Sequence, residues 1–293
     1  MGFTGILTRN PMGWCSIQLQ EALSRRGVKF VCFRFQDIVA HVGFKPIVLI
    51  KGIDVLRDVD AIIIRPIGRG SLDECIFRMD VLHRLSRFGV YIVNHPSAIE
   101  KCVDKYHALA ILEENSLPVP KTVVTENISE ALRAFRELGC DVVIKPVFGS
   151  RGHGVTRIID PDIARTVFHS LSFTHNVLYV QEFIPHGTRD IRAFVVGDEV
   201  IAAMYRESSS WKTNVAMGGR PRPLKPEGEF AELAVKAAKT LGCEVAGVDI
   251  MESSNGFVVN EVNSQPGWMG LQTVTHINIA DRIVDYVLLR ARR

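Results

Sequence analysis

The sequence lacks several features that mark secreted, membrane or nucleic-acid-binding proteins. Its six cysteines are scattered singly and none has CxxC spacing, which favours free thiols in a reducing compartment over zinc or redox motifs. No apolar run approaches membrane-spanning length, and no basic segment followed by an apolar core marks a signal peptide. The formal net charge is only +3, which argues against a nucleic-acid footprint. We therefore expect a cytoplasmic protein without nucleic-acid or membrane partners.

The sequence has the composition of a soluble globular protein, with 47% hydrophobic and 23% charged residues. Its 293 residues are enough for two or three domains. Strands and helices alternate over about the first 95 residues, which predicts an α/β fold with a parallel sheet and helices on its faces. The expected strands are 4–7, 29–33, 47–50, 61–64 and 91–94, with helices at 16–26 and 72–88.

A Pro-rich breaker, Leu117-Pro118-Val119-Pro120, follows an expected helix at 97–115 and predicts the start of a second domain. Beyond it the sequence mixes strands with amphipathic helices. Ser129 is expected to cap a helix that ends at residue 138. We predict an N-terminal domain at 1–95, a linker helix and central subdomain at 96–184, and a C-terminal subdomain at 185–293.

The loop Arg65-Pro66-Ile67-Gly68-Arg69-Gly70 follows an expected strand of the parallel sheet. Ligands of such sheets gather beyond the carboxyl ends of the strands. Arg65 and Arg69 could therefore hold an anionic substrate, or the loop could be an ordinary solvated one. The sequence favours neither reading over the other.

Lys145 interrupts a strongly apolar strand just before Pro146. Burying a lysine without an anionic partner is unfavourable, so this side chain either reaches a phosphate or carboxylate or escapes at the sheet edge. Three glycines follow within the run from Phe148 to Gly154, between two strands. Glycines allow backbone amides to approach an anion closely, and with Lys145 they predict a flap over a nucleotide.

Two strands joined by a turn, at 247–263, carry a cluster of oxygen-bearing side chains. Because the side-chain period of a strand is two, Glu261 and Asn263 should share a face with Phe257 and Val259. A three-residue loop, Ser254-Asn255-Gly256, would place Asp249 opposite Glu261. Two carboxylates and an amide suit Mg²⁺ when it also holds phosphates, although an exposed polar hairpin has the same pattern.

Taken in order, these residues resemble the ATP-grasp ligases, and specifically the RimK-like amino-acid ligases. The resemblance covers nearly the whole chain. It implies an ATP-grasp fold in which residues 1–95 precede the grasp and 96–293 form its two halves. The residues that carry it are Lys105, Lys145 before Pro146, the glycine flap, Gln181-Glu182-Phe183-Ile184, Asp190-Ile191-Arg192, Asp249, Glu261 and Asn263.

The resemblance also implies roles for single residues. Lys105 and Lys145 would contact ATP phosphates, and the main chain of residues 181–183 would read the adenine edge. Asp249, Glu261 and Asn263 would bind two Mg²⁺ ions, which Mn²⁺ could replace, with Glu261 bridging them. Other nucleotide-binding positions are Gly149, Ser150, Gly152, Gln181, Glu182, Phe183, Ile184, Asp190, Lys212, Thr213 and Asn214, with Lys212 standing where some relatives carry arginine. Catalytic positions are Lys145, Arg192 and Arg206, and substrate positions are Arg65, Arg69, Arg192, Arg206 and Ser264.

The implied reaction transfers the γ-phosphoryl group of ATP to a carboxylate and releases ADP and phosphate. An amine then attacks the acyl phosphate, and positioning with charge neutralisation carries the catalysis. The loop at 65–70 and the run Cys102-Val103-Asp104-Lys105 look most like ligases that add L-glutamate to a coenzyme acid, tetrahydromethanopterin first. Ligases of the deazaflavin coenzyme or of a lysine-pathway carrier protein are alternatives, as is a non-enzymatic nucleotide-binding regulator. A homo-oligomer, dimer or tetramer, is expected.

Overall fold

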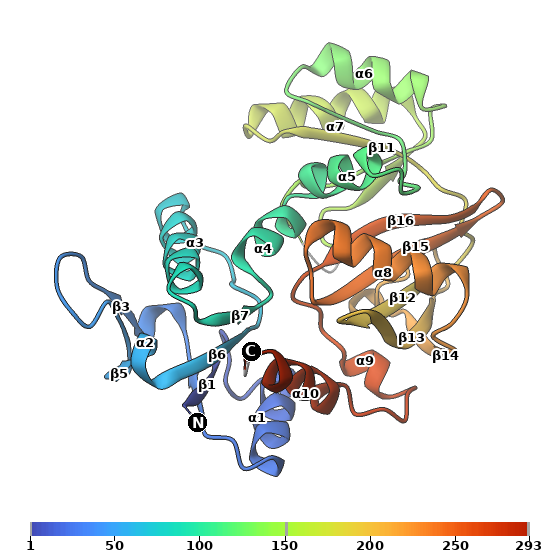
Figure 1. Cartoon of the computed structure of the whole chain (residues 1–293). Helices are drawn as coiled ribbons and strands as arrows, with labels where there is room; N and C mark the ends of the chain where they lie inside the picture. Colours follow the sequence, from blue (N-terminus) through green and yellow to red (C-terminus); the bar gives the residue numbers. More distant parts are fainter. Residues whose placement is uncertain (1, 150–151, 292–293) are drawn as a thin grey trace.

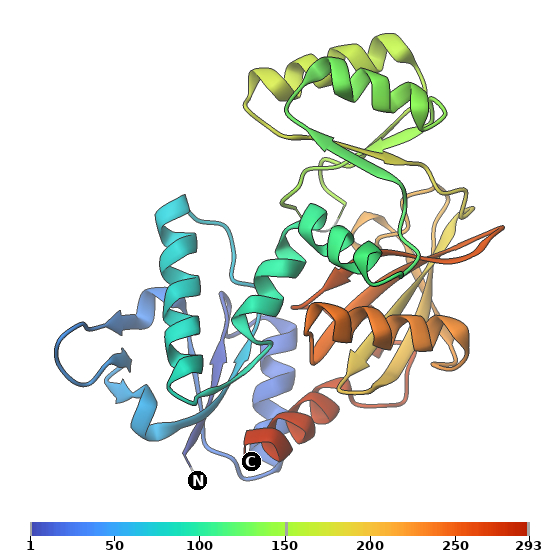
Figure 2. The same cartoon turned by 45° about the horizontal axis from the view of Figure 1, so that its top comes forward.

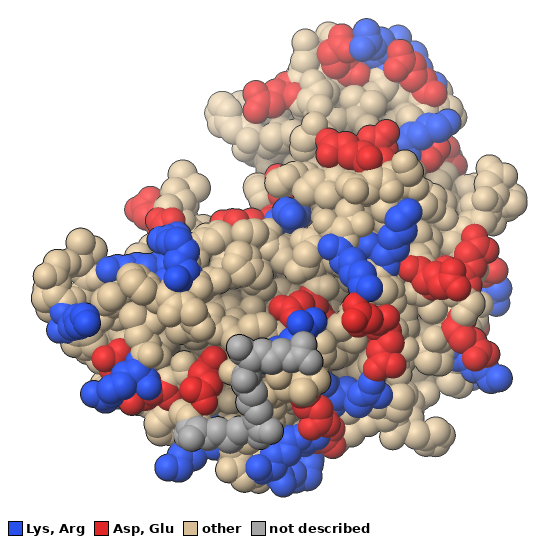
Figure 3. Space-filling model, viewed as in Figure 1, with Lys and Arg blue, Asp and Glu red and all other residues tan. Residues whose placement is uncertain are grey.

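The computed structural model describes residues 2–149 and 152–291, and four β-sheets organise them (Figure 1). In these ranges no helix combines the length and the apolar composition needed to cross a bilayer. On the face shown in Figure 3, acidic and basic side chains are intermingled rather than separated into fields of one sign.

The first sheet is parallel, as the alternation predicts. It consists of β1 (Phe3–Leu7), β2 (Phe30–Phe33), β6 (Val59–Ile64) and β7 (Tyr91–Val93) in the order β2-β1-β6-β7. Its central strands are apolar on both faces because helices cover both. Ile6 and Ile63 pack towards α1 (Trp14–Arg25) and α10 (Ile279–Ala291), whereas Leu7 and Ile64 pack towards α3 (Leu72–Arg87).

The expectation that residues 47–50 belong to the parallel sheet is wrong. They form β4 (Val48–Ile50), which pairs antiparallel with β3 (Ile38–Ala40) and β5 (Ile53–Asp54) in a separate small sheet. The apolar run predicts a strand correctly, but which strand it pairs with depends on the surrounding turns. A 3₁₀ turn, η1 (Phe35–Asp37), precedes this sheet and α2 (Val55–Asp58) follows it.

The expected helix at 97–115 is two helices, α4 (Pro96–Val103) and α5 (Lys105–Glu114). Asp104 divides them, and its carboxylate accepts hydrogen bonds from the backbone N–H groups of Tyr106 and His107 at 2.9 and 3.1 Å. It therefore caps the second helix. Lys105 is consequently the first residue of α5 and not a mid-helix residue.

The second sheet is antiparallel and forms one half of the grasp. Its strands are β8 (Thr122–Thr125), β9 (Val142–Ile144), β10 (Thr156–Ile158) and β11 (Leu178–Glu182), in the order β10-β9-β11-β8. The helices α6 (Ile128–Glu137) and α7 (Pro161–Phe173) cover one face through an apolar cluster that includes Phe135 and Phe168. Asn127, and not Ser129 as expected, caps α6.

The third sheet forms the other half and is also antiparallel. It consists of β12 (Arg189–Val196), β13 (Glu199–Glu207), β14 (Arg220–Leu224), β15 (Val245–Ser253) and β16 (Gly256–Asn263), in the order β14-β13-β12-β15-β16. The amphipathic helix α8 (Glu229–Leu241) packs on one face together with α5, through residues such as Leu109, Ala234 and Val248. The short elements η2 (Val215–Met217) and α9 (Met269–Gln272) flank this sheet.

The last helix returns to the start of the chain. Helix α10 lies beside α1 (Figure 2), where Arg26 pairs with Asp281 and Asp285. Ile283 of α10 shares one core with Leu19 of α1 and with residues of the third sheet. Residues 185–293 thus supply both half of the grasp and a cover for the N-terminal sheet.

Candidate functional site

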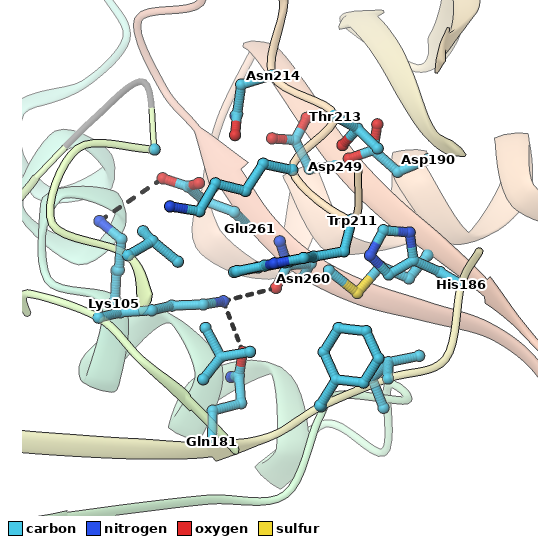
Figure 4. A pocket seen from close by; sticks show the side chains of 18 of the residues that line it. Lys105, Gln181, His186, Asp190, Trp211, Thr213, Asn214, Asp249, Asn260 and Glu261 are labelled. Atoms are coloured by element: carbon cyan, nitrogen blue, oxygen red, sulfur yellow. Dashed lines mark hydrogen bonds and ion pairs between the residues drawn. The ribbon is translucent and has the colours of Figure 1, made fainter. Parts of the chain in front are cut away.

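A cavity lies between the second and third sheets, and most of the predicted site residues line it (Figure 4). Its walls come from the β9–β10 flap, the end of β11, the loop at 211–214 and the strands β15 and β16. Ser150 falls outside the described residues. The predicted residues that line the cavity are Lys105, Lys145, Gly149, Gly152, Gln181, Glu182, Phe183, Ile184, Asp190, Arg206, Lys212, Thr213, Asn214, Asp249 and Glu261.

The β15–β16 hairpin places Asp249 directly opposite Glu261, as expected, but by a different route. Strand β15 ends at Ser253 and β16 begins at Gly256, so the turn has two residues and not three. A two-residue turn alone would put Asn260 opposite Asp249. A β-bulge at Asn260 restores the pairing with Glu261, and it also moves Glu261 off the face of the buried Val259.

Asp249 lies close to two arginines of the third sheet, Arg192 on the adjacent strand β12 and Arg206 on β13 beyond it. Its Oδ1 is 2.5 Å from Arg192 Nε, and its Oδ2 is 3.2 Å from an Arg206 amino nitrogen. The Arg206 guanidinium also donates to both carboxylate oxygens of Asp190, with Nε to Oδ1 at 2.8 Å. Gly247 leaves room for this network, because a Cβ there would lie 2.4 Å from an Arg192 nitrogen. Two carboxylates therefore hold two buried arginines.

Burial governs the electrostatics of this cluster. Burial raises the pKa of the Asp249 carboxyl above its ordinary value, against the opposing charges of Arg192 and Arg206. Burial likewise lowers the pKa of Arg192. For Arg206 burial acts downward too, but the Asp249 and Asp190 carboxylates outweigh it and raise its pKa. The two arginine cations thus offset part of the cost of burying the Asp249 carboxylate.

The oxygen atoms of the hairpin fit a hard cation. Asp249 Oδ1 is buried and receives no well-aligned hydrogen bond from the described residues, but Arg192 Nε lies 2.5 Å away, so a cation there would share this oxygen with Arg192. Glu261 faces the same cavity, and Asn263 lies one position further on that face, where its Nδ2 donates to Gly247 O at 3.4 Å. Across residues 2–149 and 152–291, no three His, Cys, Asp or Glu side chains could hold a metal together. Phosphate and water oxygens would have to complete the coordination, as for Mg²⁺ bound with a nucleotide.

Two lysines face the carboxylates from the other side of the cavity. Lys145 Nζ donates to Gln181 Oε1 at 2.6 Å and to Asn260 Oδ1 at 2.8 Å. Burial lowers its pKa from 10.5 to about 8, an effect that Glu261 opposes. Lys105 Nζ donates to Gly149 O at 2.8 Å and lies 3.7 Å from Glu261 Oε1. Neither ammonium group is fully neutralised by a carboxylate, which leaves both available to phosphate oxygens.

The glycine flap joins β9 and β10 and reaches across the cavity to the third sheet. Gly152 has a φ of +76°, and a Cβ there would lie 2.8 Å from Asn214 Oδ1. The flap therefore closes against the loop at 211–214 at a point where only glycine fits. The strand, loop, strand order expected for residues 142–159 is observed.

Most polar groups of the segment at 181–184 form hydrogen bonds with neighbouring segments of the second sheet, at Lys121 and Asp141. The backbone N–H of Glu182 donates to Lys121 O at 2.9 Å, and that of Phe183 to Asp141 O at 3.0 Å. The Glu182 carboxylate accepts from Lys121 N at 2.8 Å. Ile184 lines the cavity, and its N–H, by contrast, donates to no described residue.

Several residues of the cavity escaped the sequence reasoning, among them Asn260, Trp211 and His186. Asn260 binds Lys145 because of the bulge, and strict alternation would have placed it on the opposite face. Trp211 extends into the cavity with its ring 5.9 Å from that of Phe183 (Figure 4). His186 is buried, donates through Nδ1 to Arg189 O at 2.9 Å, and leaves Nε2 without a partner among the described residues. Of these residues, only Trp211 could have been found from the sequence, because it directly precedes the expected nucleotide-binding run Lys212-Thr213-Asn214.

Five predicted substrate or metal residues do not line this cavity. Arg65 is buried, donates to Pro266 O at 2.8 Å and stacks 4.6 Å from the Trp268 ring. Ser264 is buried beside it, and Arg192 and Asn263 border the cavity without lining it. Arg69 lines a second cavity in the N-terminal domain. The contacts of Arg65 are those of a structural residue and do not support the predicted substrate role.

Comparison with known families covers almost the whole chain. The RimK-like ATP-grasp domain matches residues 102–287, and the RimK PreATP-grasp domain matches residues 4–99. A tetrahydromethanopterin:alpha-L-glutamate ligase of Methanocaldococcus jannaschii is 40% identical over 240 residues, which are 80% of each chain. A ligase with the same name from Methanococcus maripaludis is 34% identical, over 95% of this chain and 96% of its own.

The fold has solved relatives. The structure of the ATP-grasp ligase PsnB, in complex with a minimal precursor, Mg and ADP, superposes with a TM-score of 0.77, covering 99% of this chain and 98% of that one. Its sequence identity is 21%, so the likeness concerns the fold alone. The expected α/β ATP-grasp architecture is confirmed.

Proposed function

Since the chain belongs to the RimK-like ATP-grasp family of ligases, which form carbon–nitrogen bonds, we propose that it joins L-glutamate to a carboxylate of a coenzyme acid. Tetrahydromethanopterin is the first choice of acceptor. The observation that carries the proposal is the name shared by relatives 34–40% identical over most of the chain. Ligases of the deazaflavin coenzyme, and of the lysine-pathway carrier protein named in a relative 35% identical over 66% of this chain, remain the alternatives.

ATP is proposed to lie in the cavity between the second and third sheets. Lys105 and Lys145 converge there from two elements, and their ammonium groups suit phosphate oxygens. Gly149 and Gly152 bring flap backbone close to the same space. The apolar side chains of Phe183, Ile184 and Met251 suit an adenine ring, with Ile184 N–H as a donor to its edge.

Asp249, Glu261 and Asn263 are proposed to hold Mg²⁺, with two ions and replacement by Mn²⁺ as the finer expectation. The Asp249 and Glu261 carboxylates, which lie opposite each other and line the same cavity, support this assignment. When bound with the nucleotide, Mg²⁺ would neutralise phosphate charge. The oxygen-only donor set fits Mg²⁺ or Mn²⁺ better than zinc.

The residues of the chain would act by positioning and by charge. The acceptor carboxylate displaces ADP from the γ-phosphorus, so a bond from oxygen to phosphorus forms while the bond to the ADP oxygen breaks. The glutamate amine then attacks the acyl carbon and phosphate leaves with the bonding electrons. Arg192 and Lys145 border the space where negative charge collects in both steps, and their fixed cations would stabilise it.

Arg192 and Arg206 are not free to attract an acidic substrate by their charge. In the structure, Arg206 is paired with Asp190 and Asp249, and Arg192 is paired with Asp249. The support for glutamate from these two arginines is therefore weaker, and the names of the relatives carry most of it.

Mass spectrometry of the products tests the proposal. The protein would be incubated with ATP, Mg²⁺, tetrahydromethanopterin and each amino acid in turn. We expect a mass increase of one or more glutamate residues, accompanied by ADP and orthophosphate. Formation of AMP and pyrophosphate, or a preference for lysine over glutamate, would overturn it. A homo-oligomer and a cytoplasmic location are further expectations, which sedimentation and cell fractionation can test.

A further inference from the structure

A second cavity opens at the carboxyl edge of the N-terminal sheet. Strands β1, β2 and β6 are parallel, so their carboxyl ends meet at one edge. Each is followed at once by an arginine-bearing loop: Arg9 follows β1, Arg34 follows β2 and Arg69 lies in the loop after β6. Strand β1 sits between β2 and β6, where the strand order reverses, and such switch points are where open α/β sheets bind ligands.

The charges in this cavity are not balanced by the protein. Four arginines and one glutamate line it. The Glu74 carboxylate pairs with Arg78 at 3.0 Å and accepts a hydrogen bond from Ser71 N at 2.9 Å, so it does not neutralise the other three arginines. Within the described part of the chain, Arg9, Arg34 and Arg69 have no carboxylate within ion-pair distance. All three arginines are exposed and line one cavity, so their guanidinium groups are available to pair with an anionic ligand there.

The remaining wall of the cavity is apolar and partly aromatic. Phe35 and Phe77 line it together with Ile38 and Ile67. The Arg78 guanidinium lies 5.4 Å from the Phe35 ring, which holds that ring in place. Phe77 is 44% exposed, a large fraction for a phenylalanine side chain without a ligand. A ligand with both an anionic group and a flat apolar part would match this surface.

The cavity is connected to the hairpin that carries the carboxylates. Ile67 lines the cavity, and its N–H donates to Gln265 Oε1 at 3.3 Å. Gln265 lies only four positions beyond Glu261 in the sequence. The Gln265 Nε2 atom is buried and donates to no described residue. The wall of the second cavity is thus continuous with the end of β16.

We propose that this cavity binds the acceptor acid of the ligation, with an anionic group distinct from the reacting carboxylate held by Arg9, Arg34 and Arg69. The flat part of the acceptor lies against Phe35 and Phe77. This inference rests on the proposed function, because only a ligation requires an acceptor. It moves acceptor recognition away from Arg65, Arg192 and Arg206 and into the N-terminal domain.

The test compares Arg34→Ala and Arg69→Ala with wild type, using tetrahydromethanopterin as the probe. The control is Arg87→Ala, an exposed arginine at the end of α3 that lies outside the cavity. Calorimetry would measure binding of the probe, and ADP release would give the Michaelis constants. Loss of one charge-assisted hydrogen bond corresponds to about tenfold or more in affinity. We expect that increase in the acceptor KM and Kd, with the KM for ATP unchanged and the control within about twofold of wild type.

The outcomes separate this inference from the proposed function. If wild type ligates the probe and both arginine variants keep its KM, the cavity assignment is wrong and the function stands. If wild type binds the probe through Arg34 and Arg69 but forms no product, the function is wrong and the site stands. If wild type neither binds nor ligates it, both are overturned. Arg34→Lys, which keeps the charge but loses the planar fork, should fall between wild type and alanine.

Discussion

At the residue scale, Asp249 shows how a carboxylate can be buried beside a cavity. Arg192 lies 2.5 Å from its Oδ1, and Arg206 lies 3.2 Å from its Oδ2. Arg206 is also shared with Asp190, so these arginines offset the cost of burying more than one carboxylate. The second carboxylate, Glu261, is less buried and lies within reach of Lys105.

Replacing Glu261 by Gln removes charge from the proposed metal face and keeps its shape. We expect kcat to fall about 10²- to 10³-fold, because a preorganised electrostatic partner is lost. ADP release measured over a range of Mg²⁺ concentrations checks this. The matched control is Glu252→Gln on the neighbouring strand, which pairs with Arg189 outside the cavity and should behave as wild type. Near-normal turnover of the Glu261 variant at low Mg²⁺ would show that Glu261 binds no metal.

Lys145 should make nucleotide affinity depend on pH. Burial lowers the pKa of Lys145 from 10.5 to about 8. Between these two pH values the lysine is mostly neutral in the folded protein and mostly protonated in the unfolded chain. In that window the folded state binds fewer protons, and this residue's contribution to the free energy of unfolding rises with pH. Phosphate binding needs the ammonium form, so affinity should change in the opposite direction.

Titration of Mg·ADP between pH 6.5 and 9.5 measures this effect. The wild-type dissociation constant should be flat to about pH 8 and then rise by up to about tenfold per pH unit. Lys145→Arg keeps its charge throughout that range and should remain flat. A wild-type curve as flat as that of the arginine variant would refute the contact between Lys145 and phosphate.

At the element scale, the position of Lys105 depends on where α5 begins. Asp104 caps this helix and fixes the first residue so that Lys105 reaches Gly149 and Glu261. Asp104→Ala should lower the free energy of unfolding by about 1 kcal/mol. It should also raise the KM for ATP, whereas Asp104→Asn, which keeps the capping oxygen, should do neither. Thermal unfolding measures the change in stability, and initial rates measure the KM for ATP. If the alanine and asparagine variants gave the same values, capping by Asp104 would be ruled out as the cause.

The sequence predicts elements well where their signal is local. The strands of the first sheet are recognisable because both faces are buried and the runs are apolar. The hairpin pairing of Asp249 with Glu261 was expected, but Asn260 was missed because a bulge has no marker in an alternating pattern. The one-helix expectation across Asp104 failed since an aspartate within a helical pattern does not by itself distinguish a cap from a surface residue. Pairings that depend on distant residues, such as Arg65 with Pro266, leave no local trace.

At the scale of the whole molecule, Arg65 links the N-terminal sheet to the loop after β16. Arg65→Ala should lower the free energy of unfolding by about 2–4 kcal/mol, because a buried charge-assisted hydrogen bond and a cation–π contact disappear. The acceptor KM should change little. Chemical denaturation and steady-state kinetics measure the two effects. A raised acceptor KM with unchanged stability would restore the predicted role of Arg65 in substrate binding.

The core shared by α1, α10 and the third sheet has a consequence for how the protein is made. Ile6 of β1 and Leu19 of α1 lie in the same cluster as Ile283 and Val287 of α10. Helix α10 follows both halves of the grasp in the chain, so while those are being translated that face of the N-terminal sheet has no cover. An N-terminal segment released at that stage would expose apolar surface and be open to chaperones and proteases. The first domain can therefore close only after the segments that form the grasp have been made.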